Sequence, residues 1–197
     1  MAITINGGGS ITGVSVGGLP DGIVDADMIA AGAVTSAKRG AGGILQVVET
    51  RNTAEHSGTQ TSYTDVFSAS ITPASTSNKI LIIPQVAISH ENNHAALARL
   101  VRQIGSGSFT AFGGGVGSQS NLDSNVWWNI RNTIYNVAPY TVPYLDSPST
   151  TSAVTYKVQI KTTSSSYPWA VNRTVNNSNN EYNSTIASSI TLVEVAA

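Results

Sequence analysis

The stretch TYKVQIKT, residues 155–162, decides the fold class, because apolar and polar side chains alternate along its whole length. Successive side chains of a β-strand point to opposite faces of the sheet, so this alternation is typical of a half-buried strand. We predict one buried face, with Tyr156, Val158 and Ile160, and one outer face, with Lys157, Gln159 and Lys161.

Two further segments carry strand patterns of different kinds. Residues 189–197, SITLVEVAA, also alternate, although both of their faces are partly apolar. Residues 80–83 are continuously apolar, as in a strand buried on both faces, and Pro84 then indicates a sheet edge or a bulge. In residues 189–197, one face carries Ile190, Leu192 and Glu194, and the other carries Thr191, Val193 and Val195.

Strand-like segments separated by polar turns continue from residue 44 almost to the C-terminus. Many short strands of this kind are typical of an antiparallel sandwich or a jelly roll. We therefore predict an all-β, jelly-roll-like sandwich domain over residues 43–197. The predicted strands are 44–51, 63–71, 79–89, 95–104, 109–112, 125–135, 140–145, 154–162, 169–175 and 185–195.

Residues 1–42 have a different composition, rich in glycine and poor in aromatic side chains, with a short helix predicted within residues 25–38. Burying a large apolar side chain stabilises by about 1.5–3 kcal/mol, whereas ordering each backbone residue costs about 1–2 kcal/mol. This segment is too thinly apolar to fold alone, so we predict an extended arm that docks on other copies or on a larger particle. Its anchoring side chains would be Ile3, Ile5, Ile11, Val14, Val16, Leu19, Ile23, Met28, Ile29 and Val34.

The composition excludes several classes of function. Charged residues make up 11% of the chain, against about a quarter in a typical soluble domain, and the net charge is −1. Without a basic patch, we predict neither nucleic acid nor a membrane surface as a partner. The chain has no cysteine, which excludes thiolate catalysis and cysteine zinc sites. No apolar run approaches the roughly 20 residues of a membrane span, and no signal peptide is visible.

One catalytic pattern occurs in HENNH, where His90, Glu91 and His94 match the H-E-x-x-H signature of zinc proteases. That chemistry needs a helix that points both imidazoles at one metal ion. A helix over residues 92–104 has suitable apolar spacing, but residues 96–100 also alternate as a strand and the preceding run is strand-like. The usual downstream carboxylate ligand is missing, except for Asp123. We predict a polar turn with no metal, no cofactor and no enzymatic activity; a zinc hydrolase is the remote alternative.

Aromatic residues gather between residues 127 and 144. Adjacent tryptophans on a strand face opposite sides, so we expect at most one of Trp127 and Trp128 in a given core. The other tryptophan, with Tyr140 and Tyr144, is expected at a subunit interface or on an exposed platform for a receptor sugar. The interface or core is favoured, because tryptophan is enriched at protein interfaces.

The order of several segments resembles the C-terminal β domain of bacteriophage tail-fibre and virion-surface proteins. These segments include GILQVVETRNT (43–53), NKILIIPQVAIS (78–89), YLDSPSTTSAVTYKVQIKT (144–162) and STIASSITLVEV (184–195). Residues 3–45, from ITINGGGS to GGIL, resemble the linker that precedes this domain in such proteins. The resemblance covers nearly the whole chain and implies an intertwined homotrimer mounted on a virion, without catalytic residues.

Together these observations predict a structural protein of a phage virion, assembled in the host cytoplasm. Two placements remain open. A protein that decorates or cements the capsid would contact the major capsid protein through residues 1–42, and the shortness of the chain favours this placement. A short tail fibre would contact a tail adaptor and bind the host surface, with a cell-surface glycan as the candidate receptor, and the kinship to fibre tips favours that placement.

Overall fold

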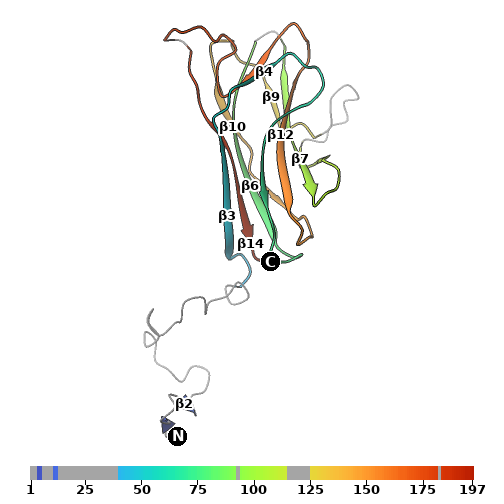
Figure 1. The fold of residues 1–197 in the computed structure, drawn as a ribbon, viewed down its shortest axis with the longest axis vertical. Helices are drawn as coiled ribbons and strands as arrows, with labels where there is room; N and C mark the ends of the chain where they lie inside the picture. Colours follow the sequence, from blue (N-terminus) through green and yellow to red (C-terminus); the bar gives the residue numbers. More distant parts are fainter. Residues whose placement is uncertain (1–3, 6–10, 13–39, 92–93, 115–124, 182) are drawn as a thin grey trace. The chain divides into compact units, whose positions relative to one another are not determined.

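The computed structural model describes residues 4–5, 11–12, 40–91, 94–114, 125–181 and 183–197 (Figure 1). The chain divides into two units, residues 1–39 and residues 40–197. In the first unit, β1 (Thr4–Ile5) and β2 (Ile11–Thr12) form an antiparallel pair that sets Ile5 opposite Ile11. The other predicted anchoring residues and the helix predicted within residues 25–38 lie outside the described residues. Across the described residues, no helix is long and apolar enough to span a bilayer.

The first sheet of residues 40–197 is built around one long central strand, β6. One side of β6 pairs with β14 and then, further along, with β13, and the opposite side pairs with β11 and then β10. Beyond them, β3 pairs with β14, and β4 pairs with β13. The bounds are β3 (Ile44–Asn52), β4 (His56–Gly58), β6 (Lys79–His90), β10 (Ala138–Thr141), β11 (Tyr144–Asp146), β13 (Trp169–Val171) and β14 (Ser188–Val195).

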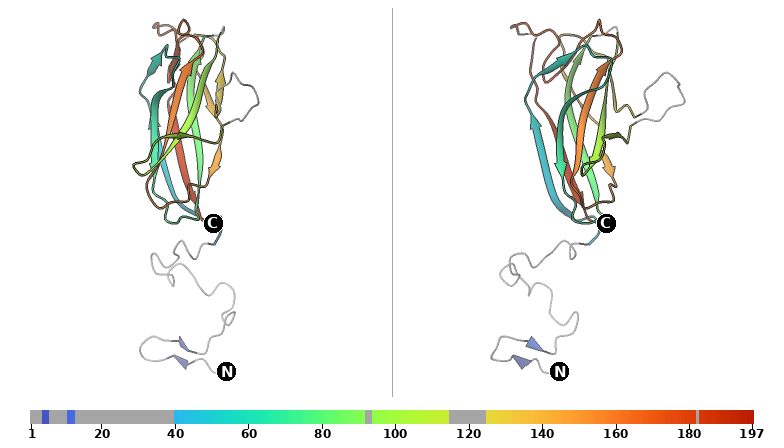
Figure 2. Two further views of the ribbon diagram at one scale, coloured as in Figure 1. Left: turned by 90° about the vertical axis from the view of Figure 1, so that its right-hand side faces the viewer. Right: turned by 45° about the vertical axis from the view of Figure 1, so that its right-hand side comes forward.

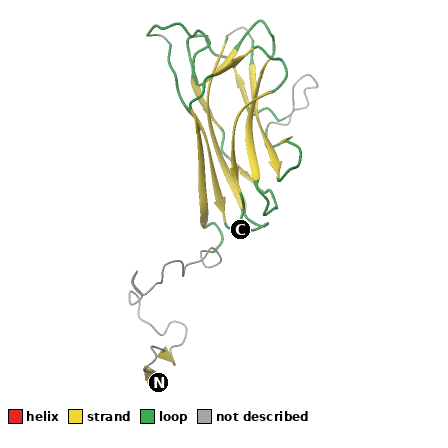
Figure 3. Ribbon diagram, in the orientation of Figure 1, coloured by secondary structure: helices red, strands yellow, loops and turns green. Residues whose placement is uncertain are grey.

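The second sheet faces the first and is centred on β12, the strand with the strictest alternation. β12 pairs with β5 on one side and with β7 on the other, and β7 then pairs with both β8 and β9. All these pairings are antiparallel, and Figures 2 and 3 show the two layers of strands joined by loops. The bounds are β5 (Thr64–Ile71), β7 (Ala96–Ile104), β8 (Thr110–Ala111), β9 (Trp128–Ile130) and β12 (Val154–Thr162).

The strand order is that of an eight-stranded jelly roll. Each of eight strand positions is filled either by one strand or by two strands in succession, and the pairs β3/β4, β8/β9, β10/β11 and β13/β14 each fill one position. Among the described residues, this gives eight positions, ordered 1-8-3-6 in the first sheet and 2-7-4-5 in the second. The same order, with two four-stranded sheets and Greek-key connections, defines the jelly roll. The predicted all-β, jelly-roll-like sandwich is therefore confirmed.

The core lies between the two sheets, where the alternation of TYKVQIKT placed it. The side chains of Tyr156, Val158 and Ile160 are fully buried, as predicted, and they belong to the same core as Ile82 and Leu192 of the first sheet. On the outer face, Lys157 pairs with Asp65 of β5 at 2.7 Å and its ammonium lies 3.8 Å from the centre of the Phe109 ring. Both outer lysines are half-buried instead of fully exposed, and the Lys161 ammonium lies 5.0 Å from the centre of the Tyr63 ring.

The structure corrects the prediction that Pro84 marks a sheet edge or a bulge. Pro84 is buried in the central strand and pairs with Ile190 of β14. On its other side lies the gap between β10 and β11, at residues 142–143. A proline lacks the N–H that a ladder requires, and this gap accommodates the missing donor in the middle of a sheet.

Several predicted strands are shorter than their sequence patterns suggested. The segment 125–135 forms a strand only at Trp128–Ile130, 109–112 only at Thr110–Ala111, and 140–145 splits into β10 and β11. β4 was missed, because HSG has no apolar alternation. The run Ile80–Ile83 alternates between buried and half-buried side chains, and the part of β6 that is buried on both faces is Val86–His90 instead.

Candidate interaction surface

The two histidines of HENNH lie in different structural contexts. His90 ends β6 with a fully buried ring, whose Nε2 lies 3.2 Å from Thr162 Oγ1. The ring of His94 packs against that of Tyr167, with centroids 4.1 Å apart. Since Ala96–Ile104 is a strand, the alternative helix over residues 92–104 is wrong for its described part. The zinc-protease geometry, with both histidines on one helix, is therefore not formed. In the described part of the chain, no group of three or more His, Asp or Glu residues could hold a metal ion.

Trp127 and Trp128 do not follow the expected alternation. β9 begins at Trp128, so Trp127 precedes the strand, and the two rings lie 5.8 Å apart on the same side. Trp128 is buried in the core, and Trp127 packs against it while donating a hydrogen bond from Nε1 to the Phe112 carbonyl at 2.8 Å. Tyr144 joins this cluster at 5.7 Å from Trp127 and is 37% exposed.

A partly buried ion pair joins the two sheets close to these rings. The Arg102 guanidinium from β7 donates to both carboxylate oxygens of Asp146 from β11, at 2.7 and 2.8 Å. The Tyr156 hydroxyl from β12 donates to the same carboxylate at 2.7 Å. Burial, together with the charge of Asp146, raises the pKa of Tyr156, so this hydroxyl keeps its proton. The network joins the two sheets. Its polar groups pair with one another and not with a ligand.

The outer face of the first sheet carries a continuous row of apolar side chains, which we call the outer apolar row. Its members are neighbours in the strand register, each on the next strand: Val47 of β3, Val193 of β14, Leu81 of β6 and Leu145 of β11. Val47 is 58% exposed and Leu145 is 48% exposed, whereas Val193 is almost covered by its neighbours. Contiguous apolar surface of this kind marks interaction sites on soluble proteins.

The neighbouring rows of the outer face are apolar on one side of the outer apolar row and become more polar on the other side. Toward the C-terminus, Ile44 pairs with Val195, and Ile44 is 57% exposed. In the opposite direction, the next row contains Glu49, Thr191 and Ile83, and the row after it contains Arg51, Ser189 and Gln85. The apolar surface is therefore concentrated at the end of the sandwich where β3 begins and β14 ends (Figure 1).

This surface was only partly visible in the sequence. The apolar character of both faces of residues 189–195 was the available signal, since Val193 faces outward. A row across four strands depends on the strand register, which residues distant in sequence determine jointly. The predicted aromatic residues instead lie elsewhere, with Tyr140 and Trp127 packed against the core.

Comparisons with known proteins find similar solved structures but assign no family. No protein family matches the chain, and no curated protein matches it. A solved structure of the infectious bursal disease virus VP2 subviral particle has a TM-score of 0.36 and 15% identity over 77% of this chain and 37% of that chain. The structure of the infectious bursal disease virus Gt strain has a TM-score of 0.35 and 13% identity over 77% of this chain and 42% of that chain. The chain thus spans about two fifths of the length of these proteins, and similarity at this level does not establish kinship.

Proposed function

We propose that this chain is a non-enzymatic structural protein of a bacteriophage virion, a homotrimer that decorates or cements the capsid. The observation that carries the proposal is the outer apolar row, which leaves the side chains of Val47 and Leu145 about half exposed on the outer face of the first sheet. A second copy of the same chain is the occupant that we propose for this face. The jelly-roll topology and the sequence resemblance to virion-surface proteins also support it.

The fold alone supports more than one role. Jelly rolls occur in viral capsid proteins, in lectin domains and in small-molecule enzymes of the cupin type, so function has to be argued from sites. The buried polar side chains pair with one another in internal hydrogen bonds, as in the network of Arg102, Asp146 and Tyr156. The exposed apolar face, in contrast, has no internal role, and association is the function that explains it.

Three-fold symmetry suits the arrangement of the rows. A rotation axis parallel to the strands keeps every cross-strand row at the same height in all copies. The outer apolar rows of three copies would then meet in one layer. Such a layer buries the apolar side chains of Val47 and Leu145 together, which is the arrangement that favours association.

The proposed attachment to the particle uses residues 1–42. The sandwich has its own core, so the arm is not needed for its fold, and the arm's apolar side chains require a partner. In the capsid placement that partner is the major capsid protein, with the arms exchanged between subunits or laid along the shell.

A second placement, a short tail fibre that binds the host, is favoured by the exposed aromatic side chains. Tyr144 is 37% exposed beside Trp127, and Tyr135 is 53% exposed. Amphipathic rings of this kind are the residues that recognition surfaces use. The partner of the arm would then be a tail adaptor.

Copy number on purified virions tests the proposal and separates the two placements. Many tens of trimers per particle, seen by imaging labelled virions, support capsid decoration, whereas a handful at one vertex supports a tail fibre. Absence of the protein from purified virions overturns the proposal. The double variant Val47→Lys, Leu145→Lys should lower occupancy, and Tyr135→Lys, an equally exposed position outside the row, should leave it unchanged.

A further inference from the structure

Three neighbouring hollows, which share lining residues, form a polar groove near the point where β13 ends and β14 begins. The first is lined by residues 177–180 and 183–185, the second by residues around Asn172 and Thr185, and the third by Glu49, Arg51, Gln85 and residues 186–189. Thr185 lines both the first and second hollows, and Arg51 lines both the second and third. Their volumes are about 230, 220 and 370 Å³.

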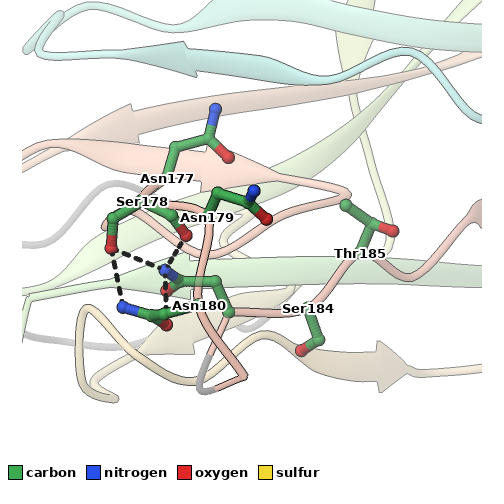
Figure 4. A pocket seen from close by; sticks show the side chains of 7 residues that line it. Asn177, Ser178, Asn179, Asn180, Ser184 and Thr185 are labelled. Atoms are coloured by element: carbon green, nitrogen blue, oxygen red, sulfur yellow. Dashed lines mark hydrogen bonds between the residues drawn. The ribbon is translucent and has the colours of Figure 1, made fainter.

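The first hollow is lined only by amide and hydroxyl side chains (Figure 4). Asn183 organises it, because its Nδ2 donates to the carbonyl and the hydroxyl of Ser178 and to Asn180 Oδ1, while its Oδ1 accepts from Thr174 Oγ1. The amides of Asn177 and Asn179 point away from this network (Figure 4). The network thus holds the loop in place and leaves these two amides, each with donor and acceptor groups, directed outward.

The floor of the groove is a break in the sheet that one strained residue maintains. Asn172 has a left-handed φ of 66° and is only 2% exposed. Its Nδ2 donates to the carbonyls of Asn52 and Ala54 at 2.9 and 2.7 Å, and its Oδ1 accepts from the Ser188 hydroxyl at 2.5 Å. These bonds bridge the gaps between β3 and β4 and between β13 and β14, where residues 172–187 leave the sheet. Non-glycine residues in this conformation concentrate at functional sites, and the surrounding bonds must compensate for the strain.

We propose that this groove binds a neutral oligosaccharide. Sugar hydroxyls both donate and accept hydrogen bonds, and amide and hydroxyl side chains are matched to them in the same way. The Arg51 guanidinium offers a planar fork of donors to neighbouring sugar oxygens, and Ile186 and Ala187 provide a small apolar surface for the C–H face of a sugar ring. Because Glu49 shares the groove with Arg51, the site has no net positive charge that would favour an acidic glycan.

Other ligand classes fit the groove less well. Nucleic acid requires several cations to neutralise its phosphates, and among the lining residues Arg51 is opposed by Glu49. An apolar peptide side chain would face amides and hydroxyls along the first hollow. This inference rests on the host-attachment placement of the proposed function, in which a host-surface glycan would be the receptor. The outer apolar row lies toward the opposite end of the same sheet, so assembly and ligand binding use different rows.

The test is binding of the purified full-length chain to immobilised oligosaccharides. One panel contains neutral chains of hexoses and N-acetylhexosamines, and a second contains chains that carry carboxylate or sulfate groups. We expect binding to the neutral panel, with at least a tenfold loss of affinity for the double variant Asn177→Ala, Asn179→Ala and for Arg51→Gln. The matched control is Asn136→Ala, which removes an exposed amide from a different loop.

Three results would overturn the inference: no binding to any neutral chain, binding to the acidic panel alone, or neutral binding that all groove variants retain. Circular dichroism of each variant checks that a loss of binding does not come from unfolding. Virion occupancy is measured separately with the same variants. Groove variants that decorate virions normally but lose sugar binding would support sugar binding by the groove and leave the assembly role intact. A wild-type chain that decorates virions but binds no sugar would overturn the groove inference and leave the proposed virion role standing.

Discussion

At the residue scale, Glu194 shows how a chain with few charged residues accommodates a buried carboxylate through neutral hydrogen-bond donors. The carboxylate is fully buried and accepts hydrogen bonds from Gln46 Nε2 at 2.6 Å, Asn78 Nδ2 at 2.6 Å and the Ala74 backbone N–H at 2.7 Å. These donors come from β3 and from the turn after β5, so one side chain ties two other segments to β14. Alternation placed Glu194 on one face with Ile190 and Leu192 but did not show which face is buried. The donors could not be identified either, because they lie more than a hundred residues away in sequence.

Replacing Glu194 should therefore be costly. We expect Glu194→Ala to lower the free energy of unfolding by about 2 kcal/mol or more, because the buried Asn78 amide and two part-buried donors lose their acceptor, and each unsatisfied buried group costs about 1–3 kcal/mol. Urea denaturation at matched protein concentration measures the effect. The exposed Glu181→Ala is the control and should stay within about 0.5 kcal/mol of the wild type. A loss below about 1 kcal/mol for Glu194→Ala would show that the hydrogen bonds contribute little.

His90 should make stability depend on pH. Burial lowers the pKa of His90 below its ordinary value, outweighing the opposite effects of backbone hydrogen bonds and of the Glu91 charge. The unfolded chain then takes up a proton more readily than the folded chain, so this contribution to stability is complete above about pH 6.5 and is lost as pH falls through the folded pKa. We expect His90→Gln to flatten the fall in melting temperature between about pH 7 and pH 5.5, and His94→Gln to retain it. An unchanged slope in His90→Gln would contradict this origin.

At the scale of the elements, alternation predicted which segments are strands but not where the strands break. The 154–162 strand has the predicted ends, since nothing in TYKVQIKT competes with pairing on both sides. The 169–175 segment instead stops at Val171, where Asn172 turns the chain into the left-handed region and out of the sheet. The tertiary fold positions the Asn52 and Ala54 carbonyls that accept hydrogen bonds from Asn172. The local sequence therefore gives no sign of the strand break other than the asparagine itself.

Two substitutions at Asn172 separate backbone strain from side-chain bonding. Asn172→Gly removes the hydrogen bonds to Asn52, Ala54 and Ser188 but suits the positive φ. Asn172→Ala removes the same bonds and also places a Cβ in a conformation that costs about 1–2 kcal/mol. We expect the order of stability wild type, Gly, Ala in denaturant unfolding, with the two variants about 1 kcal/mol apart. An alanine variant as stable as the glycine variant would show that the backbone is not held at this φ.

At the scale of the whole molecule, sequence predicted a jelly-roll-like sandwich but not its strand order or its surfaces. The order 1-8-3-6 and 2-7-4-5 joins strands that are far apart in the chain, which no periodicity encodes. The outer apolar row likewise needs four strands in register before Val47 and Leu145 become neighbours of the same patch. The aromatic residues, which stood out in the sequence, are largely used by the core, because their size makes them effective at filling it.

The arm gives a prediction about attachment. Deleting residues 1–42 should leave a folded sandwich with nearly the melting temperature of the full chain, because its core lies within residues 69–192. The truncated protein should no longer bind virions that lack the native protein, whereas the full chain should restore occupancy. If the truncated protein decorates those virions at full occupancy, the arm is not the anchor.

The most direct test of the central claim, that this chain assembles with itself through the outer apolar row, is its mass in solution by sedimentation equilibrium. We predict a species of three times the chain mass of 20.4 kDa for the wild type and for Tyr135→Lys. The double variant Val47→Lys, Leu145→Lys should sediment as a folded monomer. A monomeric wild type, or a trimer that survives both lysines unchanged, would contradict the claim.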